Sequence, residues 1–183
     1  MVRHLIVTGL FLFGLAAAAP SHAEPPSFNG TRKPFTLVKP LRPAPVTPLY
    51  TAEGGVTNVT RHGGKVILLN IWATWCAACL HELPALDRLQ ASYQKSDLVV
   101  LTVSVDDSVP QPARTYLERL GIRNLPALMD PAGRTLKAFE VYDGLPWSFI
   151  IDRKGLLRGY LMGPADWRSD AAKQLLAYYI AEK

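Results

Sequence analysis

Residues 66–79 read Val-Ile-Leu-Leu-Asn-Ile-Trp-Ala-Thr-Trp-Cys-Ala-Ala-Cys. The first seven of them are almost continuously apolar and rich in residues that favour strands, as is typical of a strand covered on both faces of its sheet. Residues 76–95 read as a helix, so two cysteines with two residues between them stand where a buried strand turns into a helix. This placement predicts an α/β protein with its chemistry at the end of a central strand.

Strands and helices alternate through the rest of the chain. The Glu53-Gly54-Gly55 turn and the alternating residues Val56-Thr57-Asn58-Val59 predict a small N-terminal hairpin, with order beginning near residues 46–50. The other predicted elements are strands at 98–105, 125–129, 147–152 and 156–162 and helices at 112–120, 134–140 and 168–182. Asp166 and Ser169 are candidate N-caps for the last helix. The order β-α-β-α-β-α-β-β-α indicates an α/β sandwich whose sheet is mostly parallel in its first half.

The composition limits the class of protein. Of the 183 residues, 49% are apolar and 19% are charged, which is enough apolar material for a sizeable core and excludes a wholly disordered chain. A formal net charge of +5 without a basic block does not support nucleic-acid binding. Only two cysteines are present, which excludes a miniprotein held by several disulfides and a multi-cysteine zinc module.

The N-terminus has the layout of a secretory signal peptide. A short polar start is followed by an apolar run, Leu5 to Ala19, which Pro20 ends. Small residues, Ser21 and Ala23, occupy the two positions of an A-x-A cleavage site, so cleavage is expected after Ala23. The apolar run is shorter than the roughly 20 residues that a membrane span needs. We therefore expect an exported, periplasmic protein without stable membrane insertion, in a compartment where disulfides persist; an uncleaved signal that anchors the chain is the alternative.

The residues after the expected cleavage site are rich in proline. Eight of the fifteen prolines lie between Pro20 and Pro48, where no apolar periodicity survives. This composition favours a flexible or polyproline-like segment. We therefore divide the chain into a signal peptide (1–23), a Pro-rich flexible lead-in (24–45) and one folded domain (46–183).

The C-x-x-C pair indicates redox chemistry. Two intervening residues let the sulfurs of Cys76 and Cys79 meet across the first helical turn, so a disulfide can open and close with little backbone movement. Free N–H groups and the dipole at a helix N-terminus favour a thiolate at Cys76, and the thiolate is the attacking species in disulfide exchange. Cys79, one turn further on, is expected to be more buried and to act as the resolving thiol.

Two other interpretations of the cysteine pair stay open. One is a structural disulfide, although closing so short a loop removes little chain entropy from the unfolded state. The other is half of a zinc or copper site, although zinc needs about four ligands and the chain has no second C-x-x-C. We expect no metal ion and no organic cofactor.

Residues 66–79 resemble the active-site strand and loop of the thioredoxin superfamily, and most closely those of the exported TlpA/ResA-like thiol:disulfide oxidoreductases. The resemblance extends over about residues 46–182. Its further motifs are Glu82-Leu83-Pro84, Ser104-Val105-Asp106, Asn124-Leu125-Pro126, Asp130-Pro131-Ala132-Gly133, Gly144-Leu145-Pro146, Phe149-Ile150-Ile151-Asp152, and Gly163 with Ala165-Asp166-Trp167. It implies a thioredoxin fold with an N-terminal β-hairpin extension and a central αβ insertion.

The resemblance implies an acid–base role for Glu82. This residue follows Cys79 by three positions on one helix, where a carboxylate can exchange a proton with a buried thiol directly or through water; a solvated helix residue is the alternative. Asn70 stands where thioredoxins themselves carry a buried Asp. Because an amide does not titrate, Glu82 is the better candidate for proton transfer, and Asn70 is interpreted as a hydrogen-bonded core residue.

A loop opposite the cysteines is expected to contact partner proteins. The resemblance implies that Pro146 is cis and that it leaves the backbone of Leu145 free to pair with a partner chain; an ordinary trans proline is the alternative. Trp75 is expected to offer a flat apolar docking surface beside Cys76. Trp147 stands where many relatives have a small polar or acidic residue, and its large ring is expected to lie beside the cysteines and to influence which partners fit.

Together these features predict a protein-disulfide oxidoreductase. The resemblance implies that it reduces disulfides of partner proteins with electrons from a thiol carrier in the membrane, and that apocytochrome c or a copper-site protein of a respiratory oxidase is the client. A Cu(I)-binding metallochaperone is one alternative, because soft thiolates suit that ion. A disulfide oxidant or isomerase is another alternative, and an interaction module with an unreactive C-x-x-C is a third.

Overall fold

Strand β4 (Val66–Trp72) lies at the centre of the fold, and all seven of its side chains are buried. A computed structural model describes residues 24–93, 97–107 and 111–182, so the expected signal peptide lies outside the described residues. The other elements are β1 (Thr36–Pro43), β2 (Leu49–Thr51), β3 (Val56–Thr57), the 3-10 helix η1 (Val59–His62), α1 (Ala77–Ser92), β5 (Leu98–Ser104), α2 (Gln111–Arg119), β6 (Leu128–Met129), α3 (Arg134–Ala138), β7 (Trp147–Ile151), β8 (Leu156–Met162) and α4 (Asp170–Ala181).

The strands form one eight-stranded mixed sheet in the order β1-β8-β7-β4-β5-β6-β2-β3. β4 pairs in parallel with β5 over its whole length, from Val66 opposite Leu98 to Trp72 opposite Ser104. On its other side β4 pairs antiparallel with β7, and β7 pairs antiparallel with β8. The predicted α/β class is therefore confirmed, with the parallel strands in the middle of the sheet.

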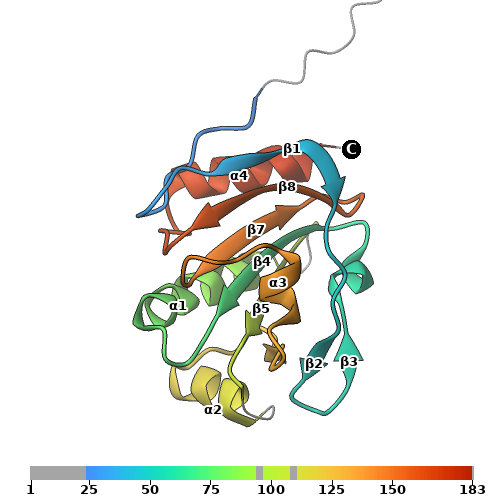
Figure 1. Cartoon of the computed structure of the whole chain (residues 1–183). Coiled ribbons are helices and arrows are strands. Elements are labelled where there is room, and N and C mark those ends of the chain that lie inside the picture. The colour runs from blue at the N-terminus through green and yellow to red at the C-terminus, as the bar shows by residue number, and fades with distance from the viewer. Residues whose placement is uncertain (1–23, 94–96, 108–110, 183) are drawn as a thin grey trace, which may run out of the picture.

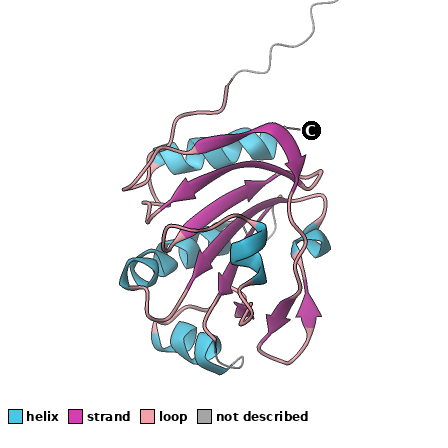
Figure 2. Cartoon of the chain, viewed as in Figure 1, coloured by secondary structure: helices cyan, strands magenta, loops and turns pink. Residues whose placement is uncertain are grey.

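Helices cover both faces of this sheet. Figure 1 shows α1 and α4 behind the sheet and α3 in front of it, and Figure 2 shows the same layers coloured by secondary structure. α1 joins the parallel strands β4 and β5, and such crossovers are right-handed, which places the helix on one defined face. α4 starts after Ser169, whose Oγ accepts a hydrogen bond from the N–H of Ala172 at 3.2 Å. Of the two predicted N-caps, Ser169 is therefore the one used.

Two additions distinguish the architecture, as predicted. The N-terminal hairpin pairs β2 with β3, with Leu49 opposite Thr57, and β2 also pairs with β6. The segment between β5 and β7, which holds the insertion, contains α2, β6 and α3. The hairpin thus extends the sheet beyond the insertion, and the whole is a thioredoxin fold with an N-terminal hairpin and a central αβ insertion.

The prediction of a flexible lead-in over residues 24–45 is wrong for much of that segment. β1 pairs antiparallel with β8, with Thr36 opposite Tyr160. Phe28 is buried, and its ring centroid lies 5.2 Å from that of Trp167. The folded unit therefore begins well before residue 46.

The prolines of β1 explain why composition misses this strand. β1 lies at the edge of the sheet, and edge strands tolerate proline because their outward N–H groups have no ladder partner. The close approach of the segment also depends on Gly159 of β8. A Cβ atom there would lie 2.4 Å from Cζ of Phe35 and 2.6 Å from the carbonyl oxygen of Thr36. The pairing is decided by contacts far apart in sequence, which no local pattern reports.

Candidate active site

The two cysteines form a disulfide at the N-terminus of α1. Cys76 is the N-cap, Cys79 lies in the first turn, and their Cα atoms are 5.3 Å apart. Sγ of Cys76 accepts a hydrogen bond from the N–H of Cys79 at 3.2 Å. Cys76 is 8% exposed, whereas Cys79 is fully buried. Cys76 is therefore the more accessible residue, and after reduction the helix N-terminus would stabilise negative charge on its sulfur.

A buried carboxylate holds the loop between β4 and α1. Asp106 follows β5, and both of its oxygens accept from the N–H of Thr74 at 3.1 Å. The Thr74 hydroxyl donates to the same carboxylate at 2.8 Å, and the hydroxyl of Ser104 donates to it as well. Because Thr74 lies two residues before Cys76, this anchor orients the cysteine loop.

The loop before β7 lies at the same end of the sheet as the cysteine loop. β7 begins with Trp147 opposite Ile71, near the end of β4. The Leu145–Pro146 peptide bond immediately before it is cis, as the resemblance implied. Trp75 is 70% exposed, which makes it one of the most exposed large apolar side chains among the described residues. An apolar surface of this kind, beside a reactive disulfide, suits contact with another protein.

The structure corrects the expectation for Trp147. Its ring is buried, with its centroid 5.8 Å from that of Phe149 and 5.3 Å from that of Tyr160. Side chains alternate along a strand, and the next residue, Ser148, belongs to the hydrogen-bonded network around Glu82 on the opposite face of the sheet. Trp147 is therefore part of an aromatic cluster in the core and not a surface for partners.

Glu82 lies inside a buried polar network. Its side chain is almost fully buried, so the alternative of a solvated helix residue is wrong. Oε1 accepts from Nδ2 of Asn70 at 2.7 Å, and Oε2 accepts from the N–H of Ala165 at 3.1 Å. Nδ2 of Asn70 also donates to Oγ of Ser148 at 3.0 Å. The carboxylate thus joins α1 to β4 and to the segment before α4, and Asn70 extends the network to β7.

This environment makes Glu82 a group that titrates near neutral pH. Burial raises the pKa of Glu82 from its ordinary 4.5 to about 7, and the hydrogen bonds from Asn70 and Ala165 limit that rise. Burial dominates because the low dielectric penalises the charged form more than the hydrogen bonds favour it. A carboxyl group with such a pKa can give or take a proton at physiological pH.

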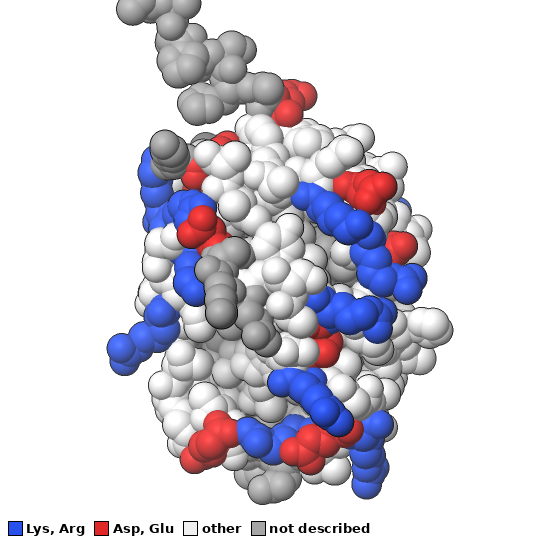
Figure 3. Space-filling view, turned by 180° about the vertical axis from the view of Figure 1, so that it is seen from behind, with Lys and Arg blue, Asp and Glu red and all other residues white. Residues whose placement is uncertain are grey.

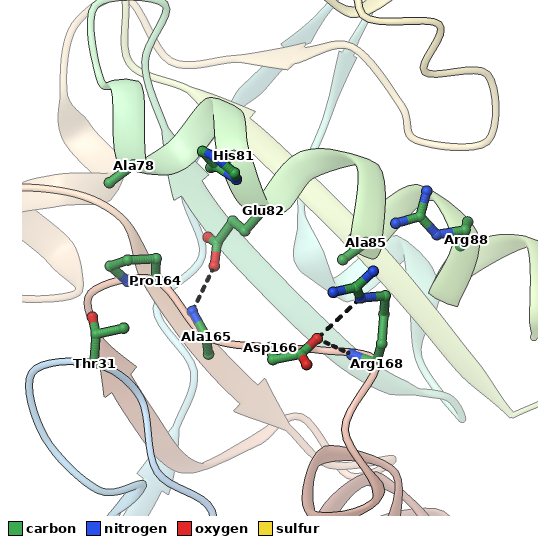
Figure 4. Close-up of a pocket in the computed structure, with 10 residues that line it drawn as sticks. All are labelled: Thr31, Ala78, His81, Glu82, Ala85, Arg88, Pro164, Ala165, Asp166 and Arg168. Atoms are coloured by element: carbon green, nitrogen blue, oxygen red, sulfur yellow. Dashed lines mark hydrogen bonds and ion pairs between the residues drawn. The ribbon is translucent and has the colours of Figure 1, made fainter.

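An open pocket of about 630 Å³ adjoins Glu82. Figure 4 shows that α1 forms one wall and the segment before α4 the other, with the Glu82 carboxylate directed across to the N–H of Ala165. The basic side chains that line it are those of His81, Arg88 and Arg168. Nε of Arg168 pairs with Asp166 at 3.2 Å. The pocket therefore brings solvent close to a buried carboxylate.

Charged side chains on one face of the molecule are of mixed sign. On the face in Figure 3, Lys and Arg are interspersed with Asp and Glu and do not form one block. Within the described ranges, no three His, Cys, Asp or Glu residues come together to hold a metal ion. In the same part of the chain, the helices are too short or too polar to cross a membrane.

Cys76, Cys79 and Glu82 are predictable from the sequence, and so is Asn70 as a hydrogen-bonded core residue, which its contacts confirm. Ser148, the other member of this network, is not predictable in this way. The available signal was a polar residue inside each of two strands that are otherwise apolar. Such residues mark buried hydrogen-bonded networks, but the sequence does not reveal which partner each one finds.

Comparison with known proteins agrees with this geometry. The sequence model of the AhpC/TSA family matches residues 40–160. The thiol-disulfide oxidoreductase ResA of Geobacillus thermodenitrificans is 32% identical over 120 residues, which are 66% of this chain and 67% of the relative. The thiol:disulfide interchange protein DsbE of Allochromatium vinosum is 32% identical over 169 residues, 90% of this chain and 86% of the relative.

A solved structure extends the comparison to three dimensions. The pneumococcal exposed lipoprotein thioredoxin Etrx1 of Streptococcus pneumoniae matches with a TM-score of 0.60 and 31% identity, over 73% of this chain and 98% of the other. The chain therefore belongs to the AhpC/TSA family, and its Cys76–Cys79 disulfide gives it the chemistry of a thiol–disulfide oxidoreductase.

Proposed function

We propose that this protein is an exported reductant of protein disulfides, with Cys76 as the nucleophile and Cys79 as the resolving thiol. The observation that carries the proposal is the asymmetry of the pair: Cys76 caps the helix and is the more accessible, whereas Cys79 is fully buried. A structural disulfide needs no such asymmetry, and closing so short a loop would add little stability.

In the proposed reaction the reduced pair gives two electrons to a partner disulfide. The thiolate of Cys76 attacks one partner sulfur, which breaks the partner's S–S bond, forms a mixed disulfide and releases the other partner sulfur to take up a proton. The thiol of Cys79 then loses its proton and attacks Sγ of Cys76, which frees the partner and restores the Cys76–Cys79 bond. We assign the proton from Cys79 to Glu82, because this carboxyl lies one turn away and titrates near neutral pH.

Partner proteins would dock on the surface around the disulfide. The exposed Trp75 ring supplies apolar area there. Leu145 precedes β7 and lies outside its ladder, so its backbone is suited to pair with an extended partner chain beside Pro146. This mode of binding would place a partner disulfide against Cys76 with little demand on the partner's sequence.

We further propose that the chain works in the periplasm after cleavage of its signal peptide behind Ala23. Electrons would come from a thiol carrier in the membrane, and the client would be apocytochrome c or a copper-site protein of a respiratory oxidase. The likeness to ResA and DsbE proteins and to an exposed lipoprotein thioredoxin supports this assignment.

The equilibrium redox potential of the Cys76–Cys79 pair tests the direction of the reaction. We expect titration against glutathione and dithiothreitol buffers to give a potential more negative than about −220 mV, on the reducing side of protein disulfide isomerases. A value near −120 mV would overturn the proposal and identify a disulfide donor. Tight Cu(I) binding by the reduced protein, together with failure to reduce insulin, would identify a metallochaperone instead.

Single serine variants test the assigned roles. Cys79→Ser should accumulate a mixed disulfide with a client, because no resolving thiol is left, whereas Cys76→Ser should form none. If Cys76→Ser traps clients as well as Cys79→Ser does, the assignment of nucleophile and resolving thiol is wrong.

A further inference from the structure

The carboxamide of Asn70 has an unusual set of contacts. The side chain is fully buried in β4, and Nδ2 uses both of its hydrogens, one toward Oε1 of Glu82 at 2.7 Å and one toward Oγ of Ser148 at 3.0 Å. Oδ1 of Asn70 is buried as well, and within the described part of the chain no donor reaches it. An acceptor without a partner in such a place is costly and needs an explanation, and a second state of the network in which this position is used provides one.

The two ends of a carboxamide can exchange places. The terminal torsion of asparagine is broad and roughly two-fold, so a half-turn puts Oδ1 where Nδ2 was. In that orientation Oδ1 would face Oε1 of Glu82 and Oγ of Ser148 at the same short distances, and both of those atoms would have to donate. The hydroxyl of Ser148 can do so because it serves as donor or acceptor. Oε1 of Glu82 can do so only when it carries a proton.

We propose that Asn70 is a positioning residue that serves both protonation states of Glu82 by turning its carboxamide. With the carboxylate, Nδ2 donates to Oε1 and to Ser148. With the carboxylic acid, Oδ1 accepts the proton of Oε1–H, and the Ser148 hydroxyl turns to donate as well. Both states keep two hydrogen bonds among Glu82, Asn70 and Ser148, so proton uptake leaves no pair of donors facing each other within this network. The buried position that Oδ1 holds beside the carboxylate is taken by Nδ2 beside the acid. The inference rests on the proposed function in one respect, namely that Glu82 exchanges a proton in each turnover.

Other groups around Glu82 do not offer this exchange. Ala165 contributes a backbone N–H, which can only donate, and it holds Oε2. In the adjoining pocket Asp166 and Arg168 are paired with each other, while His81 and Arg88 line the solvent side. On the sheet side, Asn70 and Ser148 are therefore the contacts able to change between donor and acceptor.

Nuclear magnetic resonance on the oxidised, isotope-labelled protein tests the inference without any client. The carboxyl carbon of Glu82 and the side-chain amide of Asn70 are followed from about pH 5 to about pH 9. We expect both to titrate with one midpoint, and the contacts between the Nδ2 protons and Glu82 that are present at high pH to disappear at low pH. Persistence of those contacts at pH 5, or an Asn70 amide that does not follow Glu82, would overturn the proposal.

Substitution gives a second readout. Asn70→Leu removes one hydrogen bond from each protonation state of Glu82. Because the bond to the charged form is the stronger of the two, the Glu82 midpoint should rise by about one pKa unit or less, whereas loss of a donor that served the carboxylate alone would raise it further. Gln90→Leu is the matched control. Gln90 is another buried amide, and its Oε1 accepts a hydrogen bond from the N–H of Val100 in the same sheet at 2.6 Å, without touching Glu82. Equal midpoints in the two variants would refute the role of Asn70. A protein that fails to reduce insulin while these titrations behave as expected would instead refute the proposed function alone.

Discussion

The buried carboxyl of Glu82 should make the stability of this protein depend on pH in a way that one substitution removes. Glu82→Gln keeps the shape of the side chain but carries no charge at any pH. In the native protein, burial raises the pKa of Glu82 to about 7, against 4.5 for the ordinary group. Between these two values the folded protein binds more protons than the unfolded chain, so its stability falls as the pH rises.

The size of the effect follows from the pKa difference. The difference between 4.5 and about 7, at 1.36 kcal/mol for each pKa unit, amounts to about 3 kcal/mol. This contribution is complete below pH 4.5 and is lost as the pH rises through 7. Between pH 5 and pH 8 the wild-type protein should therefore lose about 2 to 3 kcal/mol of stability, and the Glu82→Gln variant, which lacks the titrating group, should show no corresponding loss.

Urea unfolding of the oxidised protein at pH 5 and at pH 8 measures this difference. Titration of all other groups cancels when the pH dependence of the variant is subtracted from that of the wild type. Glu118→Gln is a suitable control because Glu118 is an exposed carboxylate on α2, and it should reproduce the wild-type dependence. If Glu82→Gln and the wild type change by the same amount, within about 0.5 kcal/mol, Glu82 is not a buried group that titrates near neutral pH.

Three further substitutions test other parts of the structure. Gly159→Ala should destabilise the protein by roughly 1 to 3 kcal/mol in urea unfolding, because its Cβ would overlap Phe35, and unchanged stability would contradict the docking of the N-terminal segment. Arg158→Met keeps the aliphatic part of the side chain but removes the charge that pairs with Asp152 at 3.1 Å. The free energy of unfolding should fall by roughly 1 to 3 kcal/mol, and an unchanged value would mean that this salt bridge does not stabilise the protein. Trp75→Ala should change stability by less than about 0.5 kcal/mol and slow the reduction of insulin but not of a small disulfide, whereas equal slowing of both would argue against a docking role.

The elements around the disulfide could be predicted because their signals are local. The apolar run of β4 and the helix that starts behind Cys76 lie within one window of sequence, and the predicted strand over residues 66–72 agrees with the observed one. β1 could not be predicted in the same way. Its stability comes from pairing with β8, more than 100 residues later in the chain. Its prolines give the segment the composition that is typical of a flexible linker.

The prediction that the Trp147 ring lies beside the cysteines is wrong for a different reason. Both faces of β7 are buried, so the polar Ser148 between two aromatic residues does not mark a solvent-facing side from which the two faces could be told apart. A shift of one residue exchanges the faces. Only the register of β7 against β4, with Ser148 opposite Asn70, shows that the Trp147 ring belongs to the aromatic cluster.

The sequence by itself determined the chemistry of this protein, because a C-x-x-C where a buried strand meets a helix, with a carboxylate one turn later, is a local arrangement that lies within one short stretch of the chain. The tertiary structure alone decided how that carboxylate behaves. The burial of Glu82 and its contacts with Asn70 and Ala165 come from segments 12 and 83 residues away. Desolvation is the sum of all surrounding groups, and no window of sequence contains the groups that set the pKa of Glu82.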